Sequence, residues 1–526
     1  LAFSLAAVSV GSLAHSPVHP PLSRRGADAA ELFGKGALIA VAAMTAAAAV
    51  LRFYGLGRQG FWYDEANTAL LVHLSPGKML GLLPQSESTP PLYYCIAWIW
   101  VRIFGDHEAG LRSLSALAGV LVVPVAYGAA AKLISRRAGL ITAALTACSP
   151  LLIWYSQEAR AYELMVLFTA VSLLAFAYAL KEPTGRVMTA WTVACALAMA
   201  THYYALVAVV PQALWLLVVH RRVRSVQIAV GVLVLCGLAL LPLAITQNGT
   251  KRDSWIAHSD FGVRLRQIIP QFLIGTNAPH RLVVKYLAMA LAVVALGLLA
   301  FRAGAAERRG ALLAGGLAVA GFVLALVFVA GGFDDLITRN IIALWLPAAI
   351  LIAGGLAAER ARTAGVVIAA VLCAIGVFAT AGIAAQRDMQ RPDWRYVTRA
   401  LGTGRPAAPG RAILIQHYSY LLPLSLYLPG LRDVHTPVRV RELDVISMVS
   451  PQQPLCWWGA ACNLIPSEMQ RRYDIPGLHV VSRRHVLQWT ILKMVAKRPV
   501  TLSRADVARA LHTTSLPRDE LIDQPG

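Results

Sequence analysis

Apolar stretches close to membrane-spanning length recur along most of this 526-residue chain. A helix that crosses the hydrocarbon core of a bilayer needs about 20 predominantly apolar residues. Several stretches approach this length, among them residues 37–51, 164–180, 226–245, 312–330 and 364–381. The pattern predicts an all-α polytopic membrane protein whose spans form one large helical bundle.

Composition excludes an ordinary soluble domain, because 57% of the residues are hydrophobic and only 14% are charged. The formal net charge of +21 is a feature shared with many nucleic-acid-binding proteins. Here much of the basic charge lies in short loops between apolar segments, where the positive-inside rule accounts for it. The charge therefore indicates contacts with membrane lipids and lipid phosphates, and no nucleic-acid partner.

The positive-inside rule also limits the number of spans. Twelve apolar segments can be counted, but twelve spans would place the basic loops on alternating sides of the membrane. Residues 92–104 are short for a crossing, so we expect this segment to lie in the interface or to re-enter, which leaves eleven spans. The cytoplasmic loops are then residues 132–137, 181–186, 220–224, 302–309 and 359–362.

The same register divides the chain into three parts. Residues 1–36, with Arg24 and Arg25 ahead of the first span, are expected to form a cytoplasmic tail. Residues 37–382 form the predicted transmembrane module, with juxtamembrane helices in its first outer loop. Residues 383–526 have shorter apolar runs and more charged residues and prolines, which predicts a small extracytoplasmic α/β domain.

Two of the seven cysteines, Cys456 and Cys462, stand close together in this C-terminal domain. An oxidising compartment outside the membrane permits a disulfide, and the short spacing would close a small loop. A metal site would need further Cys or His ligands, which these two residues lack. The spacing therefore favours a disulfide.

Two adjacent acids, Asp64 and Glu65, follow three aromatic residues in the first outer loop. Acids this close to a bilayer are costly unless they are paired, solvated or functional. The structural alternative is that they cap the following helical segment, residues 66–74. The aromatic residues alone are typical of an interfacial belt.

Polar residues at two further outer turns complete the main candidate site. Two prolines fix the angle at which the chain enters the segment that begins near Tyr94, and this brings Tyr94 towards the acids; helix initiation by proline is the alternative. Glu158, Arg160 and Tyr162 supply an acid, a phosphate-binding cation and a hydroxyl within five residues, or they form an ordinary polar turn.

Four more residues lie at predicted outer ends of spans. His202 and Tyr203 are either site residues or interfacial aromatics with a solvated imidazole. Arg112 and Arg339 either extend to lipid headgroups or hold a lipid phosphate. The acid pair at positions 334–335 is a simple candidate partner for Arg339.

Together these motifs resemble those of the C-type (GT-C) integral-membrane glycosyltransferases, which are related to protein O-mannosyltransferases and to the aminoarabinose transferase of lipid A. The resemblance spans roughly residues 37–381. It rests on the Asp64–Glu65 pair, the Pro90-Pro91-Leu92-Tyr93 turn, Leu111-Arg112 before a span, and residues 156–162.

The resemblance implies a GT-C fold and transfer of a monosaccharide, with inversion, from a polyprenyl-phosphate carrier. The acceptor is a glycan, lipid or protein at the outer face of a bacterial cytoplasmic membrane. Asp64 takes the role of the catalytic base or a metal-site residue, Glu65 supports it, and Glu158 matches the second acidic position. The one cofactor that the resemblance raises is a divalent metal, Mg²⁺ or Mn²⁺, held by Asp64 and Glu158.

The residue types suit this reaction, since a hydroxyl that attacks an anomeric carbon needs a carboxylate to accept its proton and a cation to hold the departing phosphate. Arg112 matches an arginine that the family associates with the lipid-phosphate sugar. The aminoarabinose transferases carry a lysine where Thr89 stands, so the phosphate-binding residue here differs from theirs. The candidate substrate-binding residues are Arg112, Arg160, Arg339, Tyr94, Tyr162, His202 and Tyr203.

Two other functions stay open at this point. A polymerase or ligase would take a pyrophosphate-linked oligosaccharide, so the chemistry of the donor separates it from the monosaccharide transferase. A flippase should show inverted repeats or helices broken by Gly and Pro near the midplane, and neither is evident. A purely structural role would leave the adjacent acids and Glu158 without a function.

Overall fold

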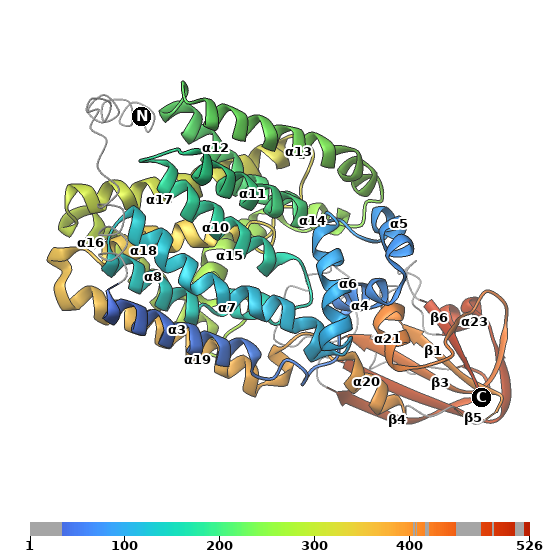
Figure 1. The fold of residues 1–526 in the computed structure, drawn as a ribbon. Coiled ribbons are helices and arrows are strands. Elements are labelled where there is room, and N and C mark those ends of the chain that lie inside the picture. The colour runs from blue at the N-terminus through green and yellow to red at the C-terminus, as the bar shows by residue number, and fades with distance from the viewer. Residues whose placement is uncertain are drawn as a thin grey trace.

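The structure, a computed structural model, describes residues 34–402, 406, 408–415, 420–448, 475–486, 489–510 and 520–526. These residues form a bundle of helices with a smaller sheet-containing domain at one end (Figure 1). Residues 1–33 of the predicted tail and the predicted Cys456–Cys462 disulfide lie outside the described residues.

Within the described part of the chain, seven helices are long and apolar enough to cross a membrane. An eighth span results if α8 (Arg136–Cys148) and α9 (Pro150–Ser156) are one helix bent by 54°. The bend has a local cause, because Pro150 lacks the N–H that would continue the helix and the Ser149 hydroxyl caps α9. The other spans are α3 (Lys35–Phe53), α7 (Glu108–Leu133), α10 (Tyr162–Ala179), α13 (Arg224–Gly249), α16 (Arg281–Arg302), α17 (Ala305–Ala330), and α19 (Arg362–Ala385) with the short η3 (Glu359–Ala361) before it.

The chain is therefore a multi-pass membrane protein, but the predicted count of eleven spans is not confirmed, because length and composition identify seven or eight in the described residues. At about 1.5 Å per residue, the 13 residues of α6 extend roughly 20 Å, which is less than the hydrocarbon core of about 30 Å. This length agrees with the expectation that residues 92–104 do not cross. The shorter helices are α6 (Leu92–Phe104), α11 (Gly185–Thr201), η1 with α12 (Tyr203–Val219), α14 (Ser254–His258), α15 (Phe261–Ile274), and η2 with α18 (Ile342–Leu356).

The two helices at the centre of the bundle are α7 and α10, which are mostly buried, whereas α13 is exposed along most of its length. Packing is tight near the start of α10: a Cβ atom at Gly119 of α7 would lie 2.1 Å from the Ser156 hydroxyl oxygen. The buried Arg52 at the end of α3 donates to Ser156 and to the carbonyl oxygens of Thr146 and Ala147. These contacts fix the position at which the turn before α10 begins.

The first loop, which we define as residues 54–107 between α3 and α7, contains α4 (Tyr63–His73), α5 (Pro76–Ser86) and α6. Proline occupies the first turn of α5 and directly precedes α6, where a missing N–H costs nothing because that group has no partner within the helix. The helices expected in this loop are thus present, and Figure 1 shows them beside the C-terminal domain.

The C-terminal domain is a mixed α/β unit, as the sequence predicts. Its sheet has the strand order β2-β6-β1-β3-β5-β4, and among these described strands only the β1–β3 pair is parallel. One face of the sheet packs against α20 and α21 through a cluster that includes Trp394 and Trp489. The elements after α19 are η4 (Arg387–Met389), α20 (Trp394–Leu401), β1 (Gly410–Ile415), α21 (Leu421–Tyr427), β2 (Arg432–Asp433), β3 (Val438–Met448), β4 (Leu478–Val486), β5 (Trp489–Leu502), α23 (Arg504–Ala510) and β6 (Glu520–Pro525).

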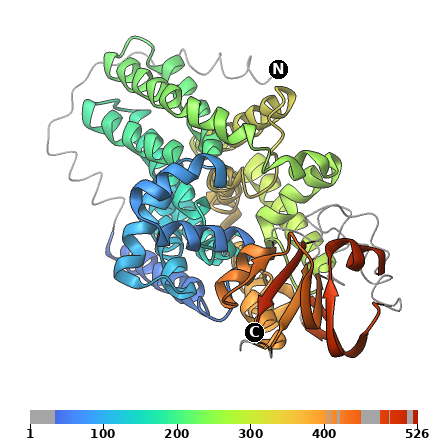
Figure 2. The same ribbon diagram turned by 90° about the vertical axis from the view of Figure 1, so that its right-hand side faces the viewer.

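The C-terminal domain is attached to the first loop by polar contacts, and Figure 2 shows the two side by side. The hydroxyl of Tyr427 donates to Glu108 at 2.7 Å and accepts from the backbone N–H of Phe61 at 2.7 Å. The backbone N–H of Gly60 donates to Asp393 at 2.9 Å. A Cβ at Gly60 would lie 2.7 Å from a backbone nitrogen of α20, so this close approach requires glycine.

Candidate active site

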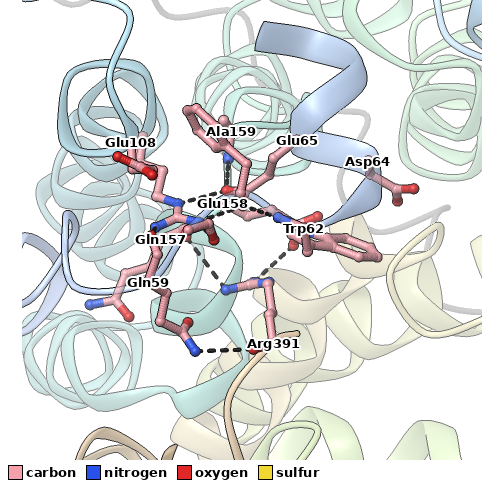
Figure 3. Close-up of polar contacts among 12 residues, drawn as sticks. Gln59, Trp62, Asp64, Glu65, Glu108, Gln157, Glu158, Ala159 and Arg391 are labelled. Atoms are coloured by element: carbon pink, nitrogen blue, oxygen red, sulfur yellow. Dashed lines mark hydrogen bonds and ion pairs between the residues drawn. The ribbon is translucent and has the colours of Figure 1, made fainter. Parts of the chain in front are cut away.

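Most of the predicted site residues converge at the end of the bundle that carries the C-terminal domain. Asp64 and Glu65 lie in the first turn of α4, close to the turn formed by residues 157–161 (Figure 3). Successive helical residues are about 100° apart, so these two neighbouring acids point in different directions. They consequently have different partners and different exposure.

Glu65 is completely buried and bonded on all sides. Both of its carboxylate oxygens accept from Arg112, at 2.7 and 2.6 Å, and one also accepts from the backbone N–H of Ala159 at 2.9 Å. The backbone N–H of Trp62, at the start of α4, donates to Glu65 at 3.4 Å. Burial alone would raise the pKa of Glu65, but Arg112 outweighs it and holds this pKa below its usual value. The capping alternative therefore fits Glu65 better than the predicted catalytic role.

Arg112, the predicted phosphate-binding residue, has no N–H left for a phosphate. Two of its five N–H groups donate to Glu65, and its side chain is only 3% exposed. The other three donate to backbone carbonyl oxygens that turn the chain towards α4, those of Leu56, Gln59 and Gly60. This geometry favours a role for Arg112 in holding the first loop, and phosphate binding by Arg112 stays a prediction.

We expect Glu65→Gln to destabilise the protein, because the guanidinium of Arg112 would stay buried without a counter-charge. Breaking one partner out of a buried ion pair costs about 3–5 kcal/mol. The measurement is the thermal unfolding temperature in detergent. The control is Asp106→Asn, which removes an exposed ion pair with His73 and should cost about 0–1 kcal/mol. An unfolding temperature equal to that of the control would contradict the structural role of Glu65.

Arg160 and Tyr94 are also held in the wall of the site. The two terminal nitrogens of Arg160 donate to the two carboxylate oxygens of Glu87 at 2.8 and 2.9 Å. The Tyr94 hydroxyl is buried and shares a hydrogen bond with that of Thr89 at 3.1 Å. Thr89, at the position where the resemblance places a lysine, therefore bonds to a neighbouring side chain.

His202 is a neutral, buried residue beside the site. Its Nδ1 accepts from the backbone N–H of Tyr204 at 3.2 Å, and its ring centre lies 5.4 Å from that of Tyr162. Burial, assisted by nearby arginines, lowers the pKa of His202 to about 3. Tyr203 lies apart from this contact and donates to Gln247 at 2.7 Å, which ties the neighbouring 3-10 helix to α13.

The ion pair between Asp64 and Arg339 is partly open to solvent. Arg339 donates to Asp64 at 3.2 Å, and their side chains are 17% and 13% exposed, in contrast to the closed pair of Glu65 and Arg112. The guanidinium carbon of Arg339 lies 5.6 Å from the ring centre of Tyr162 and 5.7 Å from that of Trp255. Two aromatic rings thus hold Arg339 next to Asp64.

Arg339 does not form an ion pair with the acids at positions 334–335, contrary to the simplest expectation from sequence. Asp334 instead accepts two hydrogen bonds from Arg264, both at 2.7 Å. Asp335 remains beside this pair, where burial and the neighbouring aspartates raise its pKa to about 7. Arg339 is therefore available to Asp64.

Glu158 is paired with Arg391, a residue that the sequence reasoning missed. Arg391 donates to one carboxylate oxygen of Glu158 at 2.8 Å (Figure 3). It also donates to the carbonyl oxygen of Trp154. Glu158 is 1% exposed; burial raises its pKa, and Arg391 opposes the shift. The available signal was a basic residue just beyond the last span, but nothing in the sequence connects it with an acid 233 positions earlier.

A divalent metal on Asp64 and Glu158 is not supported by their surroundings. Each carboxylate already has an arginine as its counter-charge. In the part of the chain that the structure describes, no group of three or more His, Cys, Asp or Glu side chains is arranged to hold a metal ion. As they are paired here, Asp64 and Glu158 do not fit a metal centre built by the protein alone.

Comparison with known proteins gives a family match over part of the chain. Residues 88–245 match the family of the dolichyl-phosphate-mannose-protein mannosyltransferase. This range contains the turn before α6, the start of α7, and the turn with Glu158, Arg160 and Tyr162. No curated protein matches the chain.

Solved structures resemble the chain over most of its length. ArnT from Cupriavidus metallidurans in the apo state has a TM-score of 0.53 at 15% identity, over 86% of this chain and 97% of that chain. The arabinofuranosyltransferase AftD from Mycobacteria has a TM-score of 0.47 at 15% identity, over 88% of this chain and 40% of that chain. The oligosaccharyltransferase of Archaeoglobus fulgidus, tethered with an acceptor peptide, has a TM-score of 0.43 at 11% identity, over 75% of this chain and 63% of that chain. The similarity to ArnT shows a common fold.

Proposed function

We propose that this chain, which has the GT-C glycosyltransferase fold and is related to protein O-mannosyltransferases and ArnT, transfers a monosaccharide from a polyprenyl-phosphate carrier to an acceptor hydroxyl. The observation that carries the proposal is the half-open ion pair of Asp64 and Arg339. A carboxylate and an arginine lie side by side in this pair, and their chemistry suits acceptance of a proton and binding of a phosphate. The family that matches part of the chain is named for a dolichyl-phosphate sugar, which supports a donor of this kind.

Asp64 is the base in the proposed reaction. The acceptor oxygen forms a bond to the anomeric carbon while the bond from that carbon to the phosphate oxygen breaks. The hydroxyl proton passes to the carboxylate of Asp64, and the polyprenyl phosphate leaves with the electron pair. Attack from the face opposite the phosphate inverts the anomeric carbon. Asp64 suits this role because, unlike Glu65, it is partly exposed and bonded to a single arginine N–H in the described structure.

Arg339 stabilises the departing phosphate. A phosphate monoester is a weak base, so it needs a positive charge more than it needs a proton. Arg112 is saturated, and the terminal nitrogens of Arg160 are bonded to Glu87. The Nε–H of Arg339 is buried and has no partner in the described structure. A terminal nitrogen of the same guanidinium donates to the carboxylate of Asp64. The isoprenoid tail stays in the lipid, which explains the location of the site at the end of a membrane-spanning bundle.

We expect transfer from polyprenyl-monophosphate sugars, and none from pyrophosphate-linked oligosaccharides. The measurement offers a panel of both donor classes to purified protein in liposomes, with an envelope extract as the acceptor source. Transfer confined to pyrophosphate donors would instead support the polymerase or ligase. Movement of donors across the bilayer without transfer would support the flippase, and either result would overturn the proposal. The site is expected at the outer face of the cytoplasmic membrane. Liposomes in which the protein has a defined orientation therefore also test on which face of the membrane the transfer takes place.

A further inference from the structure

Two buried polar atoms beside the Asp64–Arg339 pair have no hydrogen-bond partner in the described structure. One is Oε1 of Glu158, whose other carboxylate oxygen accepts from Arg391. The second is Nε of Arg339. Buried polar groups are almost always bonded, because leaving one unpaired costs free energy. A free acceptor and a free donor near one site therefore indicate a ligand that can both donate and accept.

Glu158 lies in the turn that contacts the first turn of α4, which carries Asp64. The backbone N–H of Ala159 donates to Glu65 at 2.9 Å, and Arg160 donates to the backbone carbonyl oxygen of Asp64 at 3.3 Å, next to an aromatic wall. That wall consists of Tyr155 and Tyr162, whose ring centres lie 5.2 Å apart in an edge-to-face contact. The ring of Tyr162 in turn lies against the guanidinium of Arg339. The two unpaired atoms and the pair thus belong to one aromatic-lined site.

The charges around Glu158 favour a neutral partner for its free oxygen. Arg391 already balances the negative charge of the carboxylate at 2.8 Å, and Glu158 is 1% exposed. A second cation would leave this buried region with an excess positive charge. A sugar hydroxyl, in contrast, donates one hydrogen bond to the carboxylate without adding charge, while the phosphate of the same donor molecule accepts from the Nε–H of Arg339.

We infer that Glu158 is a specificity-determining residue that accepts a hydrogen bond from one hydroxyl group of the donor sugar. This inference rests on the proposed function and identifies part of its donor site. It differs from the base or metal-ligand role suggested by the resemblance, because it places the contact on the sugar and not on the transferred proton. A hydrogen-bonding site of this kind discriminates against a donor that lacks the hydroxyl, because the buried carboxylate of the protein is then left unpaired.

The test measures binding and transfer separately. Dissociation constants are determined for polyprenyl phosphate, for the best polyprenyl-phosphate sugar of the donor panel, and for its series of monodeoxy analogues. Wild type should bind one monodeoxy donor at least tenfold more weakly than the parent. Glu158→Gln should weaken binding of the parent sugar donor by a similar factor. This variant should bind the monodeoxy analogue as tightly as the parent donor, because the contact is already lost. Its dissociation constant for polyprenyl phosphate should equal that of wild type. In transfer, KM should rise while kcat falls much less.

Control variants separate a sugar contact from a loss of structure. Glu108 is a buried acid whose two carboxylate oxygens are both bonded, one to Tyr427 and one to Arg395. Glu108→Gln therefore removes an ion pair without changing the proposed contact with the sugar. It should leave the ratio of the dissociation constants for the monodeoxy and parent donors unchanged. Glu158→Asp keeps the negative charge beside Arg391, but its shorter side chain moves the free carboxylate oxygen away from the sugar. It should therefore weaken sugar binding, and it provides the test if Glu158→Gln folds poorly. Unchanged dissociation constants, or a loss in kcat at constant KM, would overturn the inference. If wild type binds no polyprenyl-phosphate sugar, the proposed function itself fails.

Discussion

Replacement of Asp64 by asparagine should abolish most of the transfer activity while leaving the protein folded. General-base catalysis contributes about 10²–10⁴-fold to the rate, so a loss of this size is expected at saturating donor. Asparagine keeps the size of the side chain and can still accept a hydrogen bond from Arg339, but its amide cannot take up the hydroxyl proton. Because Asp64 is partly exposed, the change should cost little stability.

The measurement is kcat for wild type and Asp64→Asn at matched folded concentration, with the donor identified in the panel. Asp334→Asn is a suitable control, since Asp334 is another aspartate at an arginine-paired position in a connecting segment, bonded to Arg264 at 2.7 Å. The control should retain activity within a few fold. If Asp64→Asn were as active as this control, another group would have to accept the proton, and the assignment of Asp64 would be abandoned.

The fold was largely predictable from sequence because membrane spans and strands leave local patterns. Long apolar runs predicted the bundle, and the short run at residues 92–104 predicted a helix too short to cross. The α/β character predicted for residues 383–526 is present in the C-terminal sheet, which includes β1 and β4. The count of eleven spans is less secure, because helices such as α11 and α18 are short, and composition alone does not distinguish a short span from a helix buried within the bundle.

The partners of the charged residues could not be predicted, since they depend on contacts between distant segments. Glu65 and Asp64 are neighbours in sequence, yet one meets Arg112 and the other meets Arg339, 275 positions away. Arg112 matched a phosphate-binding pattern, but three of its N–H groups are used by carbonyl oxygens that only the folded first loop brings together. Sequence identifies the type of a residue, whereas the number of its N–H groups left for a ligand depends on the folded backbone.

The catalytic contribution of Arg339 can be measured in the same way, as kcat of a variant compared with wild type. Its removal should also lower kcat strongly. Arg339→Ala removes the positive charge from the departing phosphate, and removal of one such stabilising group lowers kcat by about 10²–10³-fold. Arg339→Lys should retain part of the activity, because lysine keeps the charge but cannot reproduce the planar contact with the rings of Tyr162 and Trp255.

Arg58→Ala provides the matched control for Arg339, because Arg58 also lies over a tyrosine ring, that of Tyr54 at 4.4 Å, but without a carboxylate partner in the described structure. Its activity should be close to wild type. A double variant of Asp64 and Arg339 should lose less than the product of the single losses, since the two side chains act on one transition state and bond to each other at 3.2 Å. Strictly multiplicative losses would mean that the two residues act independently, and a fully active Arg339→Ala would require that the phosphate be stabilised elsewhere.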